Sequence, residues 1–179
     1  MNGETQVFSP RADEDVVYVF SHILQHFFKE GIGLRQICDW CRLIWTNRES
    51  LNYGLLESRI QKAGVMSEWK AFAALAVDFL GMPIEAMPLF NDKDNKNHNL
   101  HRKAELIMDF VLETGNFGHN RDYSYYDKYP YLVFKAISLW KHFEDFGRYF
   151  IIFPLDSIKV TWRRIVVGLS VALKGKRHE

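Results

Sequence analysis

Two histidines four residues apart, His22 and His26, form the first pair in the sequence whose side chains could act together. Residues at i and i+4 lie on the same face of a helix, so both imidazoles could reach one ligand or one metal ion. Ile23 stands where the glutamate of an H-E-x-x-H metalloprotease would follow, which excludes that mechanism. Two histidines are an incomplete metal set unless a residue such as Asp39 joins them. The sequence favours a hydrogen-bonded structural pair and leaves metal binding and a ligand-facing role open.

Arg35 and Asp39 have the same spacing and follow the glycine elbow of Gly31 and Gly33. A simple ion pair within one helix would satisfy both side chains. The alternative is a ligand site. A helix that begins after Gly33 presents unpaired backbone amides, and Arg35 adds a guanidinium, so together they could hold a phosphate or carboxylate group. Asp39 would then hold Arg35 or the two histidines in place.

A second polar cluster lies in the stretch GNFGHNRDYSYYD, where polar residues alternate with aromatic ones. Its glycines, Gly115 and Gly118, permit positive φ angles. Asn116, His119 and Arg121 could converge on a polar ligand, with the tyrosines that follow as a stacking wall. The alternative is a tyrosine-rich loop that covers one end of the core and satisfies its own backbone.

The only two cysteines, Cys38 and Cys41, form a C-x-x-C motif. That spacing can mark a redox or zinc site, but the surrounding sequence has helical periodicity and there is no second cysteine pair to complete a four-thiolate zinc site. We therefore expect both thiols to pack as small apolar groups in the protein interior, in a reducing compartment.

Apolar residues recur at helical spacing along most of the chain and predict the elements that carry these side chains. The expected helices cover about residues 13–30, 34–45, 51–62, 68–81, 100–115, 131–150 and 157–176. Ser67 is expected to cap the fourth helix, and Gly81 to end it. We predict an all-α bundle of six or seven helices with two long ordered loops, in one domain that spans residues 1–179. Within it, residues 1–12 are expected to be flexible, 88–100 an exposed loop and 174–179 a frayed basic tail.

Composition narrows the classes of function. A length of 179 residues with 47% hydrophobic residues suits one domain with a dense core. The net charge of +1 argues against non-specific electrostatic binding to nucleic acid, which needs a basic surface. The N-terminus lacks the apolar core of a signal peptide, and no run of about 18 apolar residues is long enough to span a membrane. The last amphipathic segment has a basic face, but we interpret it as a bundle helix and expect no membrane contact. A cytoplasmic protein follows.

Three segments, HILQHFFKEGIGLRQICDWC, GNFGHNRDYSY and FPLDSIKVTWRR, occur in this order. On these motifs the chain, from about Val17 to Arg164, resembles the helical C-terminal portion of an uncharacterised bacterial nucleotidyltransferase family. The wider superfamily pairs such a helical part with a small mixed sheet. That sheet carries a Gly-Ser turn and carboxylates for divalent metals, which polarise the phosphates of a nucleoside triphosphate.

The catalytic half of that superfamily is not evident in this chain. The sequence has no Gly-Ser dipeptide, and its acidic pairs at alternate positions, Asp13 with Asp15 and Asp92 with Asp94, do not follow a strand. The resemblance therefore implies that divalent metal and nucleoside triphosphate are cofactors only if a separate catalytic domain supplies the carboxylates.

Together these observations predict a helical substrate-recognition portion that binds a phosphate-bearing or polar small ligand and does not catalyse a reaction by itself. The predicted partners are a nucleotidyltransferase catalytic domain, the small ligand and a second copy of the chain in a homodimer, without nucleic acid or membrane. No catalytic and no metal-binding residue is assigned. The predicted ligand-binding residues are His22, His26, Arg35, Asp39, Asn116, His119 and Arg121.

Two other functions stay open. One is a helical protein-protein interaction module, which would pack on a partner domain or self-associate through an apolar face. The other is a self-sufficient metal-dependent enzyme that uses His22, His26 and Asp39.

Overall fold

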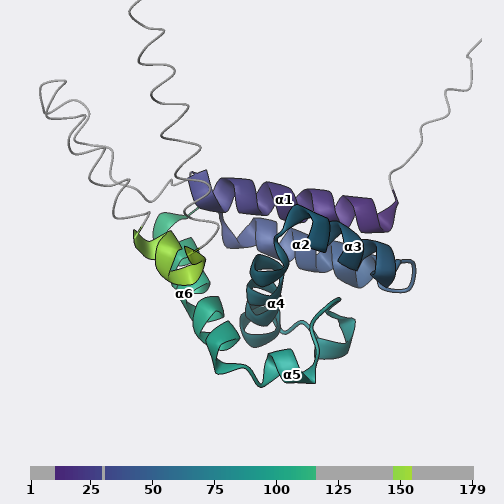
Figure 1. Ribbon diagram of the computed structural model, residues 1–179. Helices are drawn as coiled ribbons and strands as arrows, with labels where there is room; N and C mark the ends of the chain where they lie inside the picture. Colours follow the sequence, from purple (N-terminus) through teal and green to yellow (C-terminus); the bar gives the residue numbers. More distant parts are fainter. Residues whose placement is uncertain (1–10, 30, 116–146, 155–179) are drawn as a thin grey trace, which may run out of the picture.

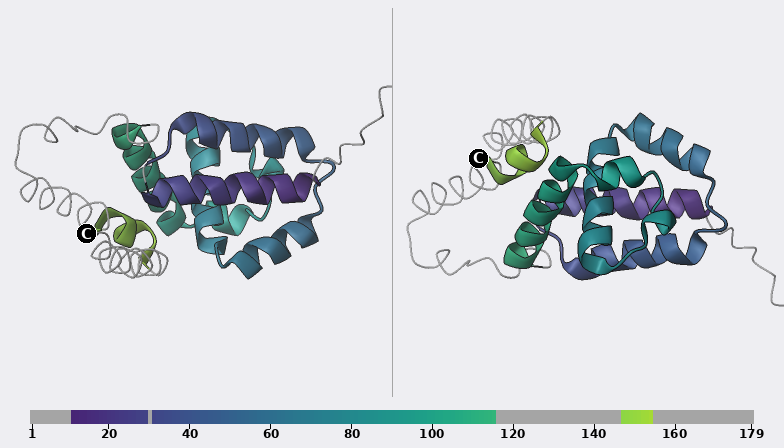
Figure 2. Two further views of the ribbon diagram at one scale, coloured as in Figure 1. Left: turned by 90° about the horizontal axis from the view of Figure 1, so that it is seen from above. Right: turned by 90° about the horizontal axis from the view of Figure 1, so that it is seen from below.

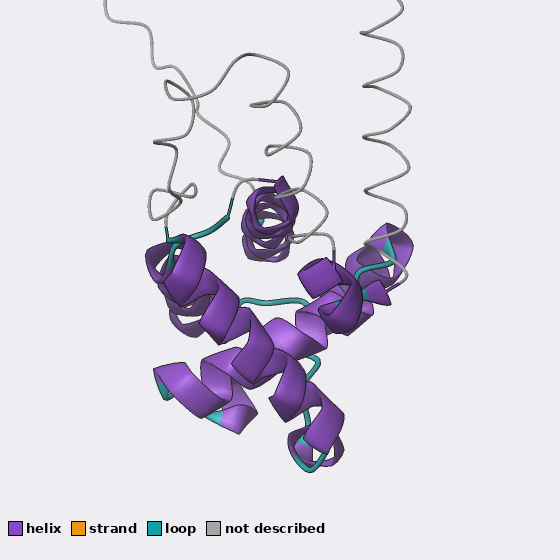
Figure 3. Ribbon diagram, turned by 90° about the vertical axis from the view of Figure 1, so that its left-hand side faces the viewer, coloured by secondary structure: helices purple, strands orange, loops and turns teal. Residues whose placement is uncertain are grey.

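The computed structural model describes residues 11–29, 31–115 and 147–154 of the chain. These residues form an all-α fold that contains no strand, as the sequence predicts (Figure 3). The helices are α1 (Ala12–Lys29), α2 (Leu34–Asn47), α3 (Tyr53–Ala63), α4 (Met66–Leu80), the 3-10 helix η1 (Ile84–Ala86), α5 (Asp92–Asn95) and α6 (His98–Thr114). Residues 147–152 are also helical. The expected helix at 157–176, most of the one at 131–150 and both terminal segments lie outside the described residues.

Helix α1 lies between α2 and α3 and packs against both (Figure 2). Its apolar residues recur every three or four positions, so that Val16, Phe20 and Phe27 all face the core and are fully buried. At the N-terminal end of α1, Arg59 of α3 forms an ion pair with the buried carboxylate of Asp13 at 3.3 Å. This pair ties the start of α1 to α3.

Helix α4 crosses α1 and α2 at a steep angle and packs most extensively against α6 (Figure 1). Its alanines at 71, 73, 74 and 76 are fully buried, and their small side chains allow the neighbouring helices to approach closely. Trp69 of α4 completes an aromatic cluster with Phe20 and Trp40, in which the ring centroids lie 4.9–5.1 Å apart. The Trp69 indole also donates a hydrogen bond to the carbonyl of Pro88 at 2.8 Å.

The ends of α3 and α4 confirm two glycine stops and correct one predicted cap. Gly64 and Gly81 both follow their helices with a φ of 70°, the left-handed conformation that favours glycine. Ser67 does not cap α4, because the helix begins at Met66, one residue before Ser67, and Val65 occupies the cap position. The backbone carbonyl of Val65 accepts the first helical hydrogen bond, from the amide of Trp69 at 2.9 Å.

The segment 88–100 exposes most of its polar residues, as predicted, but it is not a loop throughout, because it contains α5 and the start of α6. Asn91 and Asp94 form a capping box that starts the short helix α5. Phe90, Asp94 and Leu100 are buried, and Lys70 of α4 forms an ion pair with Asp94 at 2.7 Å. The segment is therefore fastened to α4 by both apolar and charged contacts.

No helix in the described ranges is long and apolar enough to cross a membrane.

Candidate ligand surface at the α1–α2 elbow

The two histidines of α1 form a hydrogen-bonded pair at the solvent-facing side of the helix. Their Nε2 atoms lie 3.1 Å apart, and the ring planes meet at 78° with centroids 4.4 Å apart. The exposed ring of Tyr18 lies nearly parallel to that of His22, at an angle of 10° and a centroid distance of 6.5 Å. His22 is exposed and His26 is half-buried. The predicted structural pairing is therefore present, on a surface that a ligand could reach.

The elbow after α1 needs glycine at its first position. Gly31 has a φ of +98°, and its amide donates a hydrogen bond to the carbonyl of His26 at 3.0 Å. A Cβ atom on Gly31 would lie 2.9 Å from the Oγ1 of Thr114, so the elbow backbone rests directly against the C-terminal end of α6. That contact also places the elbow beside Gly115, the residue that precedes Asn116 in the sequence.

Helix α2 begins after Gly33 without a side-chain cap and without an acidic residue in its first turn. Arg35 and Asp39 approach each other at 4.0 Å, and their side chains are 92% and 67% exposed. An ion pair this long and this exposed contributes little to stability. Beneath them, Trp40 is fully buried. The charged side chains of α2 are thus available to solvent, while its aromatic face builds the core.

The other predicted ligand-binding residues, Asn116, His119 and Arg121, lie outside the described residues.

The C-x-x-C motif divides between surface and core. Cys41 is buried, as predicted, but Cys38 is exposed, which corrects the expectation that both face the interior. Burial raises the pKa of the Cys41 thiol to about 12, with a smaller contribution from the nearby Cys38. Since the thiolate is the reactive form, Cys41 is a poor nucleophile and metal ligand at neutral pH.

One carboxylate of each acidic pair in the sequence forms an ion pair with a neighbouring helix. The carboxylate of Asp13 faces Arg59, and that of Asp94 faces Lys70. Within the described ranges, no group of three histidine, cysteine, aspartate or glutamate side chains could hold a metal ion. Asp39 therefore does not complete a three-ligand site with His22 and His26.

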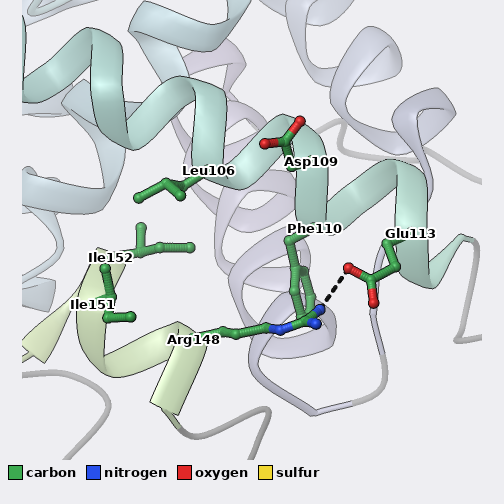
Figure 4. A pocket seen from close by; sticks show the side chains of 7 residues that line it. All are labelled: Leu106, Asp109, Phe110, Glu113, Arg148, Ile151 and Ile152. Carbon is green, nitrogen blue, oxygen red and sulfur yellow. Dashed lines mark hydrogen bonds and ion pairs between the residues drawn. The ribbon is translucent and has the colours of Figure 1, made fainter.

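A small cleft lies between α6 and residues 147–152, and no motif in the sequence predicts it (Figure 4). It encloses about 160 Å³ and is mostly apolar, with Leu106 and Ile152 among its lining residues. Among its lining residues, Arg148 donates a hydrogen bond from its guanidinium group to the carboxylate of Glu113 of α6 at 2.6 Å. The opposite charges at positions 113 and 148 are separated by 35 residues, a distance over which sequence periodicity predicts no pairing.

His101 is a second residue that the sequence did not single out. Its Nδ1 donates to a carboxylate oxygen of Asp78 at 2.6 Å, and its Nε2 donates to the carbonyl of Asn95 at 2.5 Å. Because both ring nitrogens face acceptors, the geometry favours the imidazolium form. The hydrogen bond that His101 donates to Asp78, and then the one to Asn95, raise the pKa of His101 above its ordinary value of 6.5. The ring of His101 thus joins α4, the end of α5 and α6.

This linkage predicts a pH-dependent stability. A raised pKa in the folded state means that the stabilisation by His101 is complete below about pH 6.5 and is lost as pH rises through the folded-state pKa. We expect a loss of about 1 kcal/mol in the free energy of unfolding, because the ion pair is partly exposed. Urea unfolding from about pH 5.5 to about pH 9 measures it against His101→Gln. Parallel pH profiles for the two proteins would contradict the assignment.

Comparison with protein-family models, curated proteins and solved structures finds no match for this chain. The resemblance to a nucleotidyltransferase family therefore rests on the sequence motifs themselves.

Proposed function

We propose that this chain is the helical substrate-recognition portion of a nucleotidyltransferase-like protein, which binds a phosphate-bearing or polar small ligand at the α1–α2 elbow. The proposal joins the resemblance of the elbow motif to the positions of its side chains in the fold. The catalytic carboxylates would come from a separate domain, because one carboxylate of each acidic pair, that of Asp13 or of Asp94, is engaged in an ion pair between helices.

The observation that carries the proposal is that, within residues 22–40, apolar side chains build the core while polar side chains face solvent. The apolar side chains of this stretch, such as Phe27 and Trp40, are fully buried, so packing explains why they are there. The polar side chains of His22, Arg35 and Asp39 face solvent and contribute little to the core. These exposed polar side chains therefore leave a surface that a polar ligand can reach.

Two further features favour an anionic ligand. The start of α2 carries the partial positive charge of a helix N-terminus, and neither a side-chain cap nor an acidic first turn neutralises it. Arg35 adds a full positive charge within that first turn. The elbow also touches the end of α6, where the carbonyl oxygen of Gly115 would lie 3.4 Å from a Cβ atom on Gly31.

Calorimetric titration with magnesium-ATP and with pyrophosphate tests the proposal. We expect binding by the unmodified protein and about tenfold weaker binding by Arg35→Gln, since a hydrogen bond to a charged group contributes about 1.5 kcal/mol or more. Arg42→Gln is the matched control, because Arg42 is an exposed arginine farther along the same helix. Equal affinity in the two variants, or no binding at all, would contradict the proposal.

The competing function is a helical interaction module. Leu112 of α6 and Ile151 are large apolar side chains that are 60% and 64% exposed, which is the kind of surface that such a module uses. Sedimentation velocity separates the two functions. Concentration-dependent self-association together with indifference to both phosphate compounds would favour the module.

A further inference from the structure

We propose that His22 and His26 form a two-histidine chelating site for a divalent transition-metal ion, with Cu²⁺, Ni²⁺ and Zn²⁺ as the ions of suitable chemistry. The sequence alone leaves this pair undecided, because i and i+4 spacing fixes a shared helix face but not the distance between the ring nitrogens. The fold supplies that distance, and the inference does not depend on the proposed function.

The separation of the two Nε2 atoms fits one metal ion between them. Metal-to-imidazole bonds are about 2.0–2.1 Å long. Two such bonds to nitrogens 3.1 Å apart enclose an angle of about 95–102° at the metal. That angle lies between the values of square-planar or octahedral and of tetrahedral coordination, so each of the three ions can be accommodated by small rotations of the rings.

The rings are already held in a converging arrangement. At 3.1 Å one Nε2 must donate a proton and the other must accept it. A metal ion that binds both Nε2 atoms displaces this proton, which moves to the Nδ1 atom of the donor ring. The ring of Tyr18 lies nearly parallel to that of His22, with centroids 6.5 Å apart. Because the side chains already converge before the ion arrives, binding loses less conformational entropy than it would between two independent histidines.

The surroundings decide which ions the site takes. Neutral imidazole nitrogen suits copper, nickel and zinc, whereas magnesium and calcium prefer oxygen ligands. In the part of the chain that the structure describes, no third histidine, cysteine, aspartate or glutamate joins the pair. His22 is exposed, so water can fill the remaining coordination positions. Affinity should follow the general order for nitrogen ligands, in which Cu²⁺ binds more tightly than Ni²⁺ or Zn²⁺.

The test is a calorimetric titration of the full-length protein, without a histidine tag, with the chloride salts of Cu²⁺, Ni²⁺ and Zn²⁺ in the absence of nucleotide. We expect one binding event per chain that weakens by about tenfold or more in His22→Ala and in His26→Ala, because even outer-shell changes cost metal sites 10–100-fold. His98→Ala removes an exposed histidine at the start of α6 and should leave the binding unchanged.

A spacing variant separates chelation from a simple count of histidines. The double change His22→Ser with Ser21→His keeps the composition but moves one imidazole to i and i+5, off the shared face. It should bind as weakly as His22→Ala, while circular dichroism confirms an unchanged helix content. Unchanged binding in this variant, or in either single alanine variant, would place the metal elsewhere in the chain and overturn the proposal. No metal binding by the unmodified protein would also overturn it. Neither outcome bears on the response to phosphate compounds.

Discussion

Replacing Phe27 by alanine is expected to lower the free energy of unfolding by about 3–5 kcal/mol. Phe27 is fully buried, and its ring contacts aromatic rings from four separate parts of the fold. The partners are Phe28, Phe72, Phe110, Tyr149 and Phe153, at centroid distances of 5.3–6.4 Å. Alanine would leave a cavity where α1, α4, α6 and residues 147–154 meet, and no single helix can shift to fill it. The change removes a large part of the stability of an ordinary domain.

Denaturant unfolding followed by circular dichroism measures this loss. Phe79→Ala is the matched control, because Phe79 of α4 is 45% exposed and should cost less than about 1 kcal/mol. Phe27→Leu keeps most of the volume and guards against a variant that does not fold. It should fall between Phe27→Ala and the unmodified protein. Equal costs at positions 27 and 79 would contradict the placement of Phe27 at the centre of the core.

Gly31→Ala is expected to destabilise the protein by about 2–3 kcal/mol. The φ of +98° is a strained conformation for any residue with a side chain, and the new methyl group would lie 2.9 Å from the Oγ1 and 3.1 Å from the Cβ of Thr114. Thr114 cannot simply turn away, because it is buried and its hydroxyl donates to the carbonyl of Phe110 at 2.8 Å. The elbow would have to separate from the end of α6.

Thermal and denaturant unfolding again provide the measurement. Gly54→Ala is a suitable control, because its Cβ would meet only the Oδ1 of Asn52, at an ordinary 3.6 Å, in the first turn of α3. That change should be neutral or stabilising, since alanine is the better helix former. A cost below about 0.5 kcal/mol for Gly31→Ala would show that the elbow and α6 are not in close contact.

The helices were predictable from sequence because their signals are local. The apolar stripe of α1 predicts its course to within about one residue at each end, and Gly64 and Gly81 end their helices as glycines do. Ser67 was misassigned because a cap residue type locates a helix start only to within one or two residues. The helix begins at Met66, which places Ser67 inside its first turn.

The segment 88–100 was misread for a different reason. Asparagine and aspartate are typical of exposed turns, and the same residue types also form capping boxes. The choice between the two depends on what the segment packs against. Here the ammonium group of Lys70, more than twenty residues earlier in the chain, donates a hydrogen bond to the carboxylate of Asp94. No local pattern contains that information.

The candidate site was predictable in part. Helical spacing predicts that His22 shares a face with His26 and that Arg35 can reach Asp39, and both pairs are present. Spacing does not give the separation of the imidazole nitrogens or the exposure of Arg35, because these depend on rotamers and neighbouring helices. The contact between Gly31 and Thr114 joins residues more than eighty positions apart, so only the folded chain reveals that the elbow touches the end of α6.

The hydroxyl of Tyr149 donates a hydrogen bond to the carbonyl of Phe27 at 2.6 Å, across 122 residues of chain. During synthesis on a ribosome, α1 and α2 emerge long before Tyr149 is made. The carbonyl of Phe27, in the last turn of α1, can therefore accept this hydrogen bond only after Tyr149 has been synthesised. Nascent chains that stop short of residue 149 would hold the elbow less firmly than the finished protein does.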